Sequence, residues 1–323
     1  MAIIDQKLDI DHPEYKDSIV DYTEYGDVEK QEISMHGPAV ASLLVGKDCG
    51  VAPGAKLVYK ASEVSRNQEE RFKSYPKALK DIIETNQQLS PENKVRIVSC
   101  SINYNEGGPE NNIEYNISEW IETLEKAKEA GIFVVDVNGR QIGLSFVGGG
   151  SSSNKNNFES YSTGLFEKDE EENEELNKII SEGNIDEILK KLREVKKDNL
   201  VNISDIDLRK KVIEYLNESK KEKEKEIIIP SDYRTMASSW NKKGQYMYNG
   251  RGGISWSVPY LAGLFALILQ VNPNIKREEI ADIINESAVV NEKGLRIINP
   301  KGIIDLAKRS VSSNLTSSAD LKN

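Results

Sequence analysis

The sequence is poor in the residues that build metal centres and disulfide frameworks. Its 323 residues include only two cysteines and two histidines. A zinc site or a disulfide scaffold needs more ligands or partners than this set supplies. Cys49 and Cys100 both stand in apolar contexts, and we interpret them as small core residues. The composition therefore argues against a disulfide-stapled or zinc-bound protein.

The chain also lacks a surplus of positive charge. Its formal net charge is −10, which leaves nothing to neutralise phosphates and argues against a nucleic-acid partner. We expect no apolar run of membrane-spanning length and hence no membrane partner. The N-terminus, MAIIDQKLDID, is not typical of a signal peptide. This favours a cytoplasmic protein; the alternative is a secreted protein whose leader and propeptide are absent from this chain.

What the chain does contain is a repeated alternation of apolar strands and helical patterns. Strands are predicted at 2–5, 56–62, 95–102 and 132–137, and helices at 36–46, 75–86 and 116–131. This order predicts a three-layer α/β/α fold with a mostly parallel central sheet covered on both faces. Functional groups of such folds gather at the carboxyl ends of the strands.

The alternation breaks at GGGSSSNKNN (148–157), which is typical of a loop. Beyond it, residues 165–226 contain 33 charged residues among 62, with apolar positions at helical spacing. We interpret 165–226 as a charged, helical insertion within a single domain spanning 1–323. It is either a solvated decoration or a lid, regulatory or partner-binding surface.

Elements of the predicted fold return after the insertion. A strand is predicted at 226–230, a Gly- and Tyr-rich loop at 242–253, an apolar helix from 254, a helix within 273–288 and a frayed polar tail at 310–323.

Three polar residues stand at the ends of predicted elements. Asp5 closes the first strand, His36 begins the first apolar helix, and Ser255 lies at the start of the later apolar helix. A serine hydroxyl becomes a nucleophile when a base takes its proton and a third group orients that base. Taken singly, each residue has a structural alternative: a turn aspartate, a structural histidine and a helix-start serine. Together they fit one mechanism.

The segments around these residues resemble the sequence blocks of subtilisin-like serine peptidases (subtilases, the peptidase S8 family). AIIDQKLDIDHPEY resembles the aspartate block, HGPAVASLLVG with GVAPGAKLVYKAS the histidine block, and GISWSVPYLAGLFALILQVNP the serine block. The order Asp, His, Ser is also that of subtilisin. The long separation of His36 and Ser255 approaches the family length once the charged insertion is removed.

The resemblance implies a subtilisin-like fold and a serine endopeptidase acting on protein or peptide substrates through an acyl-enzyme intermediate. Ser255 would be the nucleophile, His36 the general base and then acid, and Asp5 the residue that orients His36. It also implies an oxyanion-stabilising asparagine after the strand at 132–137. There the chain reads VVDVNGRQ, which makes Asn138 the favoured donor and Arg140 the alternative.

The resemblance implies no obligatory cofactor. Calcium is possible by family analogy, because some relatives build a calcium site from a long loop after the histidine helix. Here that loop, VGKDCGVAP, is short, so no calcium site is identifiable.

Two other interpretations stay open. The altered flanks Ile254 and Trp256, together with the altered oxyanion segment, motivate a catalytically impaired pseudoprotease that uses the fold for binding or signalling. The stretch GGGSSSN suggests a nucleotide-binding α/β protein, but it lacks the Lys-Ser/Thr of a phosphate-binding loop.

Overall fold

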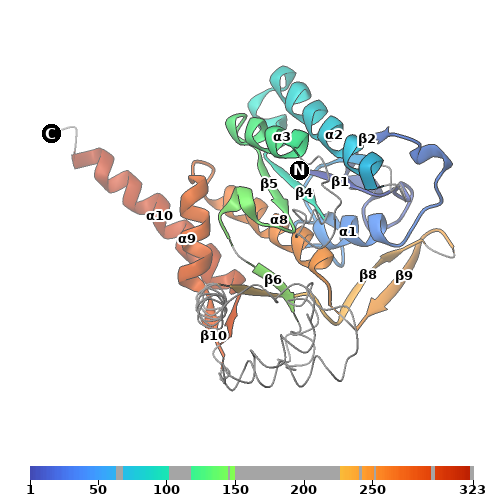
Figure 1. The fold of residues 1–323 in the computed structure, drawn as a ribbon. Coiled ribbons are helices and arrows are strands. Elements are labelled where there is room, and N and C mark those ends of the chain that lie inside the picture. Colours follow the sequence, from blue (N-terminus) through green and yellow to red (C-terminus); the bar gives the residue numbers. More distant parts are fainter. Residues whose placement is uncertain are drawn as a thin grey trace, which may run out of the picture. The chain divides into compact units, whose positions relative to one another are not determined.

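The fold is seen in a computed structural model (Figure 1). It describes residues 1–62, 68–101, 118–144, 146–149, 226–239, 242–250, 252–291 and 295–320. All of these except Glu226 belong to one compact unit, formed by Met1–Ser152 and Ile227–Asn323. The predicted insertion at 165–226 lies, apart from Glu226, outside the described residues, as does the GGGSSSN segment beyond Gly149.

A five-stranded parallel sheet forms the centre of this unit, with strand order β2-β3-β1-β4-β5. Its strands are β1 (Ala2–Asp5), β2 (Ile19–Tyr25), β3 (Leu57–Ser62), β4 (Ile97–Cys100) and β5 (Phe133–Asp136). A second sheet has the order β10-β11-β7-β6. Its strands are β6 (Phe146–Gly149), β7 (Ile227–Pro230), β10 (Val289–Val290) and β11 (Arg296–Ile297). An antiparallel pair, β8 (Arg234–Ser238) and β9 (Gln245–Asn249), completes the strands of the described residues.

Helices cover both faces of the central sheet, which confirms the predicted three-layer fold (Figure 1). They are α1 (His36–Val45), α2 (Gln68–Gln88), α3 (Ser118–Glu129), α8 (Ile254–Val271), α9 (Arg277–Ser287) and α10 (Pro300–Asp320), with short 3-10 turns at Lys16–Ser18, Val28–Lys30, Pro91–Asn93 and Arg140–Ile142. Alternate residues of a strand point to opposite faces. Ile3 accordingly packs with α1 and α8, whereas Ala2 and Ile4 pack with α2 and α3.

Helix α1 packs directly onto the chain that leaves β1. A Cβ atom on Gly37 would lie 2.7 Å from the carbonyl oxygen of Gln6 and 2.8 Å from that of Lys7. Only glycine allows backbones to approach so closely. This approach places the first residue of α1, His36, beside the last residue of β1, Asp5.

Helix α8 corrects one expectation from the sequence. By length and composition it is apolar enough to cross a membrane, so the expectation that no run reaches that length is wrong. The helix is a core element, because Val258, Leu261 and Phe265 are buried in the main apolar cluster. A Cβ atom on Gly263 would lie 2.6 Å from Cβ of Val51, so glycine lets α8 lie against the segment that follows α1.

Other differences from the sequence expectations concern exposed or polar segments. The sequence does not predict strand β2, because its residues are mostly half-buried or exposed and lack an apolar alternation. The predicted loop at 242–253 contains β9, whose pairing with β8 supplies the strand structure. The tail predicted to fray is helical to Asp320. Cys100 is buried as expected, whereas Cys49 is only partly buried.

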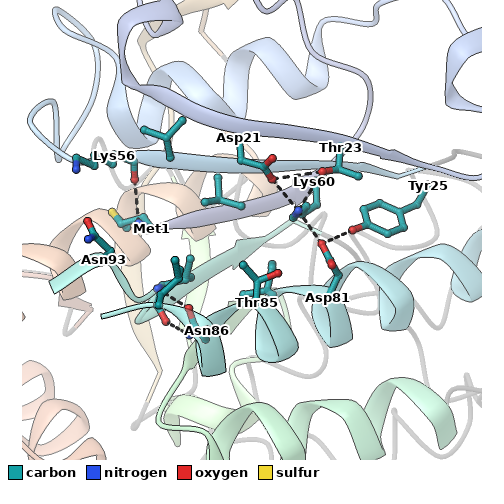
Figure 2. Close-up of a pocket in the computed structure, with 15 residues that line it drawn as sticks. Met1, Asp21, Thr23, Tyr25, Lys56, Lys60, Asp81, Thr85, Asn86 and Asn93 are labelled. Atoms are coloured by element: carbon teal, nitrogen blue, oxygen red, sulfur yellow. Dashed lines mark hydrogen bonds and ion pairs between the residues drawn. The ribbon is translucent and has the colours of Figure 1, made fainter. Parts of the chain in front are cut away.

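A buried lysine ties the edge of the central sheet to α2 beside a cavity of about 570 Å³. Figure 2 shows the Lys60 ammonium between Asp21 and Asp81, at 2.7 Å from Oδ2 of each carboxylate. The Lys60 side chain is 5% exposed, so these carboxylates compensate the loss of its hydration. Tyr25 donates a further hydrogen bond to Asp81, at 2.6 Å.

Replacing Asp81 by Asn should make stability less dependent on pH below 4. Burial by itself raises the pKa of Asp81, but hydrogen bonds from Lys60 and Tyr25 outweigh it and lower the pKa below its usual 3.8. The carboxylate therefore stabilises the fold above pH 4, and this contribution is lost as the pH falls through the folded-state pKa. Because Asp81 is partly exposed, we expect Asp81→Asn to cost about 0.5–1.5 kcal/mol at pH 7.

The measurement is urea unfolding at pH 7 and pH 3, where the difference between wild type and Asp81→Asn should shrink at the lower pH. Asp17→Asn is the matched control, because Asp17 is exposed and its loss should change stability by less than about 0.5 kcal/mol. An equal cost at both pH values would contradict the ionic role of Asp81.

Candidate active site

Asp5 and His36 form a direct pair at the carboxyl end of β1. The distance between Asp5 Oδ1 and His36 Nδ1 is 2.6 Å. The side chain of Asp5 is 3% exposed and that of His36 is 21% exposed. A carboxylate only accepts hydrogen bonds, so this contact assigns the proton of a neutral imidazole to Nδ1 and leaves Nε2 as an acceptor.

A network of neutral groups holds this pair in place. The Gln6 amide donates to Asp5 Oδ1 at 2.8 Å, and the His36 amide donates to Ser34 Oγ at 3.1 Å. Ser34 in turn donates to Gln6 Oε1, and the Tyr59 hydroxyl donates to the Gln6 carbonyl, both at 2.5 Å. Burial, and then the charge of Asp5, raise the pKa of Tyr59 well above its usual range, so its hydroxyl remains a donor. The backbone on both sides of the pair is therefore fixed.

Ser255 is the second residue of α8 and is half-buried. Two serines at strand ends bind the backbone at the start of α8. Ser101, which follows β4, donates to the Ser255 carbonyl at 3.0 Å. Ser231, which follows β7, accepts a hydrogen bond from the Gly253 amide at 3.0 Å. The helix N-terminus at Ser255 carries partial positive charge, which stabilises negative charge that forms nearby.

Trp256 connects the start of α8 to the Asp5–His36 pair. The centroids of the Trp256 and His36 rings are 5.3 Å apart, and the rings are tilted by 40°. The residue after Ser255 thus contacts the residue that pairs with Asp5. All three predicted residues lie at one edge of the sheet.

The predicted oxyanion residues follow β5, a neighbour of β4 in the same sheet. Asp136 ends β5 and is buried, and its Oδ1 accepts hydrogen bonds from the amides of Asn138 at 3.1 Å and Gly139 at 2.8 Å. Gly139 has a φ of 62°, a left-handed conformation that favours glycine. This turn leaves Asn138 exposed just beyond the carboxyl edge of the sheet. Arg140 begins the next 3-10 turn, and its side chain lies outside the described residues.

The second histidine, His12, is fully buried away from this pair. Its Nδ1 accepts from the Glu14 amide at 3.2 Å, so its Nε2 donates to the Gln245 carbonyl at 2.8 Å. Its ring stacks on Tyr15 and meets Tyr246 edge-on. These contacts give His12 a structural role between the chain after β1 and β9.

Glu14 binds the short loop that follows α1. Its Oε2 accepts hydrogen bonds from the amides of Asp48 at 3.0 Å and Cys49 at 3.3 Å, and its Oε1 accepts from Tyr246 at 2.9 Å. Within the described part of the chain, no group of three or more His, Cys, Asp or Glu side chains is arranged to hold a metal ion. In this loop the buried Glu14 carboxylate binds backbone amides.

The family model of the subtilases matches residues 1–303. The chain belongs to the subtilase family. A search of curated protein sequences gives no match. Similar solved structures include the prenylagaramide maturation protease PagA, with 14% identity, coverage of 94% of this chain and 92% of that one, and a TM-score of 0.53. The A-subunit of the AB5 toxin from E. coli gives 15% identity, coverages of 95% and 92%, and a TM-score of 0.52.

The protease domain of PatA, solved as a point mutant, gives 14% identity, coverages of 96% and 94%, and a TM-score of 0.52. At these identities the likeness concerns the fold alone. It is the three-layer α/β/α fold of subtilisin-like serine peptidases, as the sequence blocks predict.

Sequence reasoning missed the residues that hold the site from a distance. Ser101 and Ser231 bind the start of α8 across 154 and 22 positions of the chain. Their only signal was a position directly after a buried apolar strand. Trp256 had a stronger signal, because it is an altered flank of the serine block, but nothing in the sequence indicates its contact with His36.

Replacing Glu14 by Gln should destabilise the loop after α1. Glu14 is 3% exposed and accepts three hydrogen bonds. In glutamine an NH₂ group replaces one carboxylate oxygen, so a donor would face the backbone amides or the Tyr246 hydroxyl that now donate to Glu14. We therefore expect a cost of about 1–3 kcal/mol. Urea unfolding measures the cost, and hydrogen exchange should show lost protection at the amides of Asp48 and Cys49.

The matched control is Asp48→Asn in the same loop, where the side chain is 73% exposed. It should change stability by less than about 0.5 kcal/mol. Equal effects of the two substitutions would show that Glu14 does not anchor the loop.

Proposed function

We propose that this subtilase is an active serine endopeptidase that uses Asp5, His36 and Ser255 as its catalytic triad. The observation that supports it is the hydrogen bond of 2.6 Å between Asp5 and His36, next to the helix start that carries Ser255. Such a bond gives His36 the tautomer that a general base needs. The substrates are then proteins or peptides, as expected of a serine peptidase.

In this mechanism Ser255 Oγ attacks the carbonyl carbon of the scissile peptide bond while His36 Nε2 takes the hydroxyl proton. Asp5 stabilises the imidazolium that forms and remains ionised. His36 then gives its proton to the leaving amine, the C–N bond breaks and an acyl-enzyme remains. Water attacks this ester with His36 again as base, which releases the carboxylic acid and restores Ser255.

The negative oxygen of the tetrahedral intermediate needs hydrogen-bond donors. The N-terminus of α8 brings its first backbone amides and its positive end to the position of Ser255. Asn138 is the favoured side-chain donor, because the turn after β5 leaves it exposed at the carboxyl edge of the sheet. Arg140 is the alternative donor.

The second candidate function is a pseudoprotease that keeps the fold for binding or signalling. The observation that favours it is Trp256, a large side chain beside His36 at a position of the serine block. The insertion at 165–226 is a candidate partner or regulatory surface in either case, and it lies outside the described residues apart from Glu226.

A fluorophosphonate probe distinguishes the two functions. It forms a covalent bond to an activated serine, so wild type should be labelled and Ser255→Ala should not. His36→Ala should label slower by about 10³-fold or more, because the base is lost while the serine remains. Labelling is followed by intact mass, with circular dichroism to verify folding. Absence of labelling in folded wild type would favour the pseudoprotease, and labelling of Ser255→Ala would refute the assigned nucleophile.

The oxyanion assignment is tested by comparing Asn138→Ala with Arg140→Ala. Loss of one oxyanion donor lowers kcat by about 10²–10³-fold and affects KM less. We expect this loss for Asn138→Ala and a change below about tenfold for Arg140→Ala. Steady-state kinetics with a peptide substrate measures both. The reverse pattern would assign the role to Arg140, and two small effects would leave the backbone amides of α8 as the donors.

A further inference from the structure

The indole of Trp256 contacts both His36 and the chain before Ser255. Its ring centroid lies 5.3 Å from that of His36. A Cβ atom on Gly253 would lie only 3.1 Å from the indole Nε1. The residue is 8% exposed, so the ring has little freedom to move.

Helix termini and nearby side chains both affect the charge on the His36 imidazole. Both α1, which begins at His36, and α8, which begins at Ile254, direct helix N-termini toward this edge. Their partial positive charge opposes a proton on the imidazole. Neither helix contains Asp, Glu, Lys or Arg, and Tyr59 from β3 is held neutral. Asp5 from β1 is a negative partner of His36.

An aromatic face attracts a cation within about 6 Å of its centroid. The Trp256 ring lies within this distance of the His36 ring, so it attracts the protonated imidazole. This attraction counteracts the two helix N-termini, which disfavour the protonated form. Tryptophan has the strongest such face among the aromatic residues, and the attraction grows when water is excluded. The indole also packs against the imidazole at a tilt of 40°, and this contact restricts rotation of the imidazole away from Asp5.

We propose that Trp256 is a positioning residue that holds the His36 ring against Asp5 and stabilises its protonated form. This inference rests on the proposed peptidase function, since the protonated form arises when Ser255 gives up its proton. It goes beyond the triad by assigning to Trp256 part of the electrostatic support that the imidazolium needs.

The test is an NMR titration of the histidine Cε1–H signals in wild type, Trp256→Phe and Trp256→Leu. The chain has only two histidines, and His36→Ala assigns the signals. Removing the aromatic face should move the His36 midpoint about 0.4–1 pH unit lower in Trp256→Leu. Trp256→Phe keeps an aromatic ring and should show less than half of this shift. If Trp256→Leu does not fold, Trp256→Met supplies the non-aromatic comparison.

Two internal controls separate this effect from a general loss of packing. His12 contacts Tyr15 and Tyr246, so its signal should not respond to Trp256. Trp120→Leu removes a buried indole from α3, on the opposite face of the sheet, and should lower the melting temperature without moving the His36 midpoint.

The pH dependence of kcat/KM gives the corresponding kinetic result. Its acid limb should move to lower pH in Trp256→Leu, with a lower plateau, and should be largely retained in Trp256→Phe. An unchanged His36 midpoint in folded Trp256→Leu, or equal shifts in Leu and Phe variants, would overturn the inference. The titration needs no turnover, so it tests Trp256 even if the fluorophosphonate experiment refutes the peptidase.

Discussion

The contact between the end of β1 and the start of α1 is the constraint on which the candidate site depends. The hydrogen bond between Asp5 and His36 measures 2.6 Å and joins residues 31 positions apart. It forms because Gly37 lets α1 lie against the carbonyl groups of Gln6 and Lys7. A side chain at that position would push the helix away and lengthen the bond. The chemistry proposed for His36 therefore depends first on backbone packing.

Sequence patterns predicted those parts of the fold in which burial decides the structure. Strands β1, β4 and β5 are entirely buried, so their apolar runs were sufficient signals. Strand β2 and the hairpin partner β9 are largely exposed, and backbone pairing with a neighbour decides their structure. The same distinction applies to the site. Asp5, His36 and Ser255 stand at the ends of helices and strands that the sequence pattern predicts. In a parallel sheet such ends gather at the carboxyl edge of the strands.

Contacts that cross the chain had no such local signature. Glu14 binds the amides of Asp48 and Cys49, 34 and 35 positions away, and a lone glutamate after a turn gives no sign of this. Ser101 acts on the Ser255 carbonyl over 154 positions. Small hydroxyl groups and carboxylates are common in loops, so their role appears only when the packing of α1, α8 and the strand ends is known. The short loop after α1 shows the consequence: a buried carboxylate satisfies backbone amides there.

Electrostatics at the candidate site follow from the same packing. Two helices begin at this edge, and neither contains Asp, Glu, Lys or Arg. In the proposed mechanism, their N-termini favour the negative oxygen of the tetrahedral intermediate and oppose the positive imidazolium that forms at the same step. A fold that uses helix N-termini to stabilise the negative oxygen needs another group to stabilise the positive imidazole. In the proposed mechanism Asp5 stabilises the imidazolium at Nδ1, and the Trp256 ring, which we infer to stabilise it as well, brings no second negative charge near the oxyanion. A carboxylate in the place of Trp256 would stabilise the imidazolium more strongly but would repel the oxyanion, whereas an aromatic ring separates the two requirements.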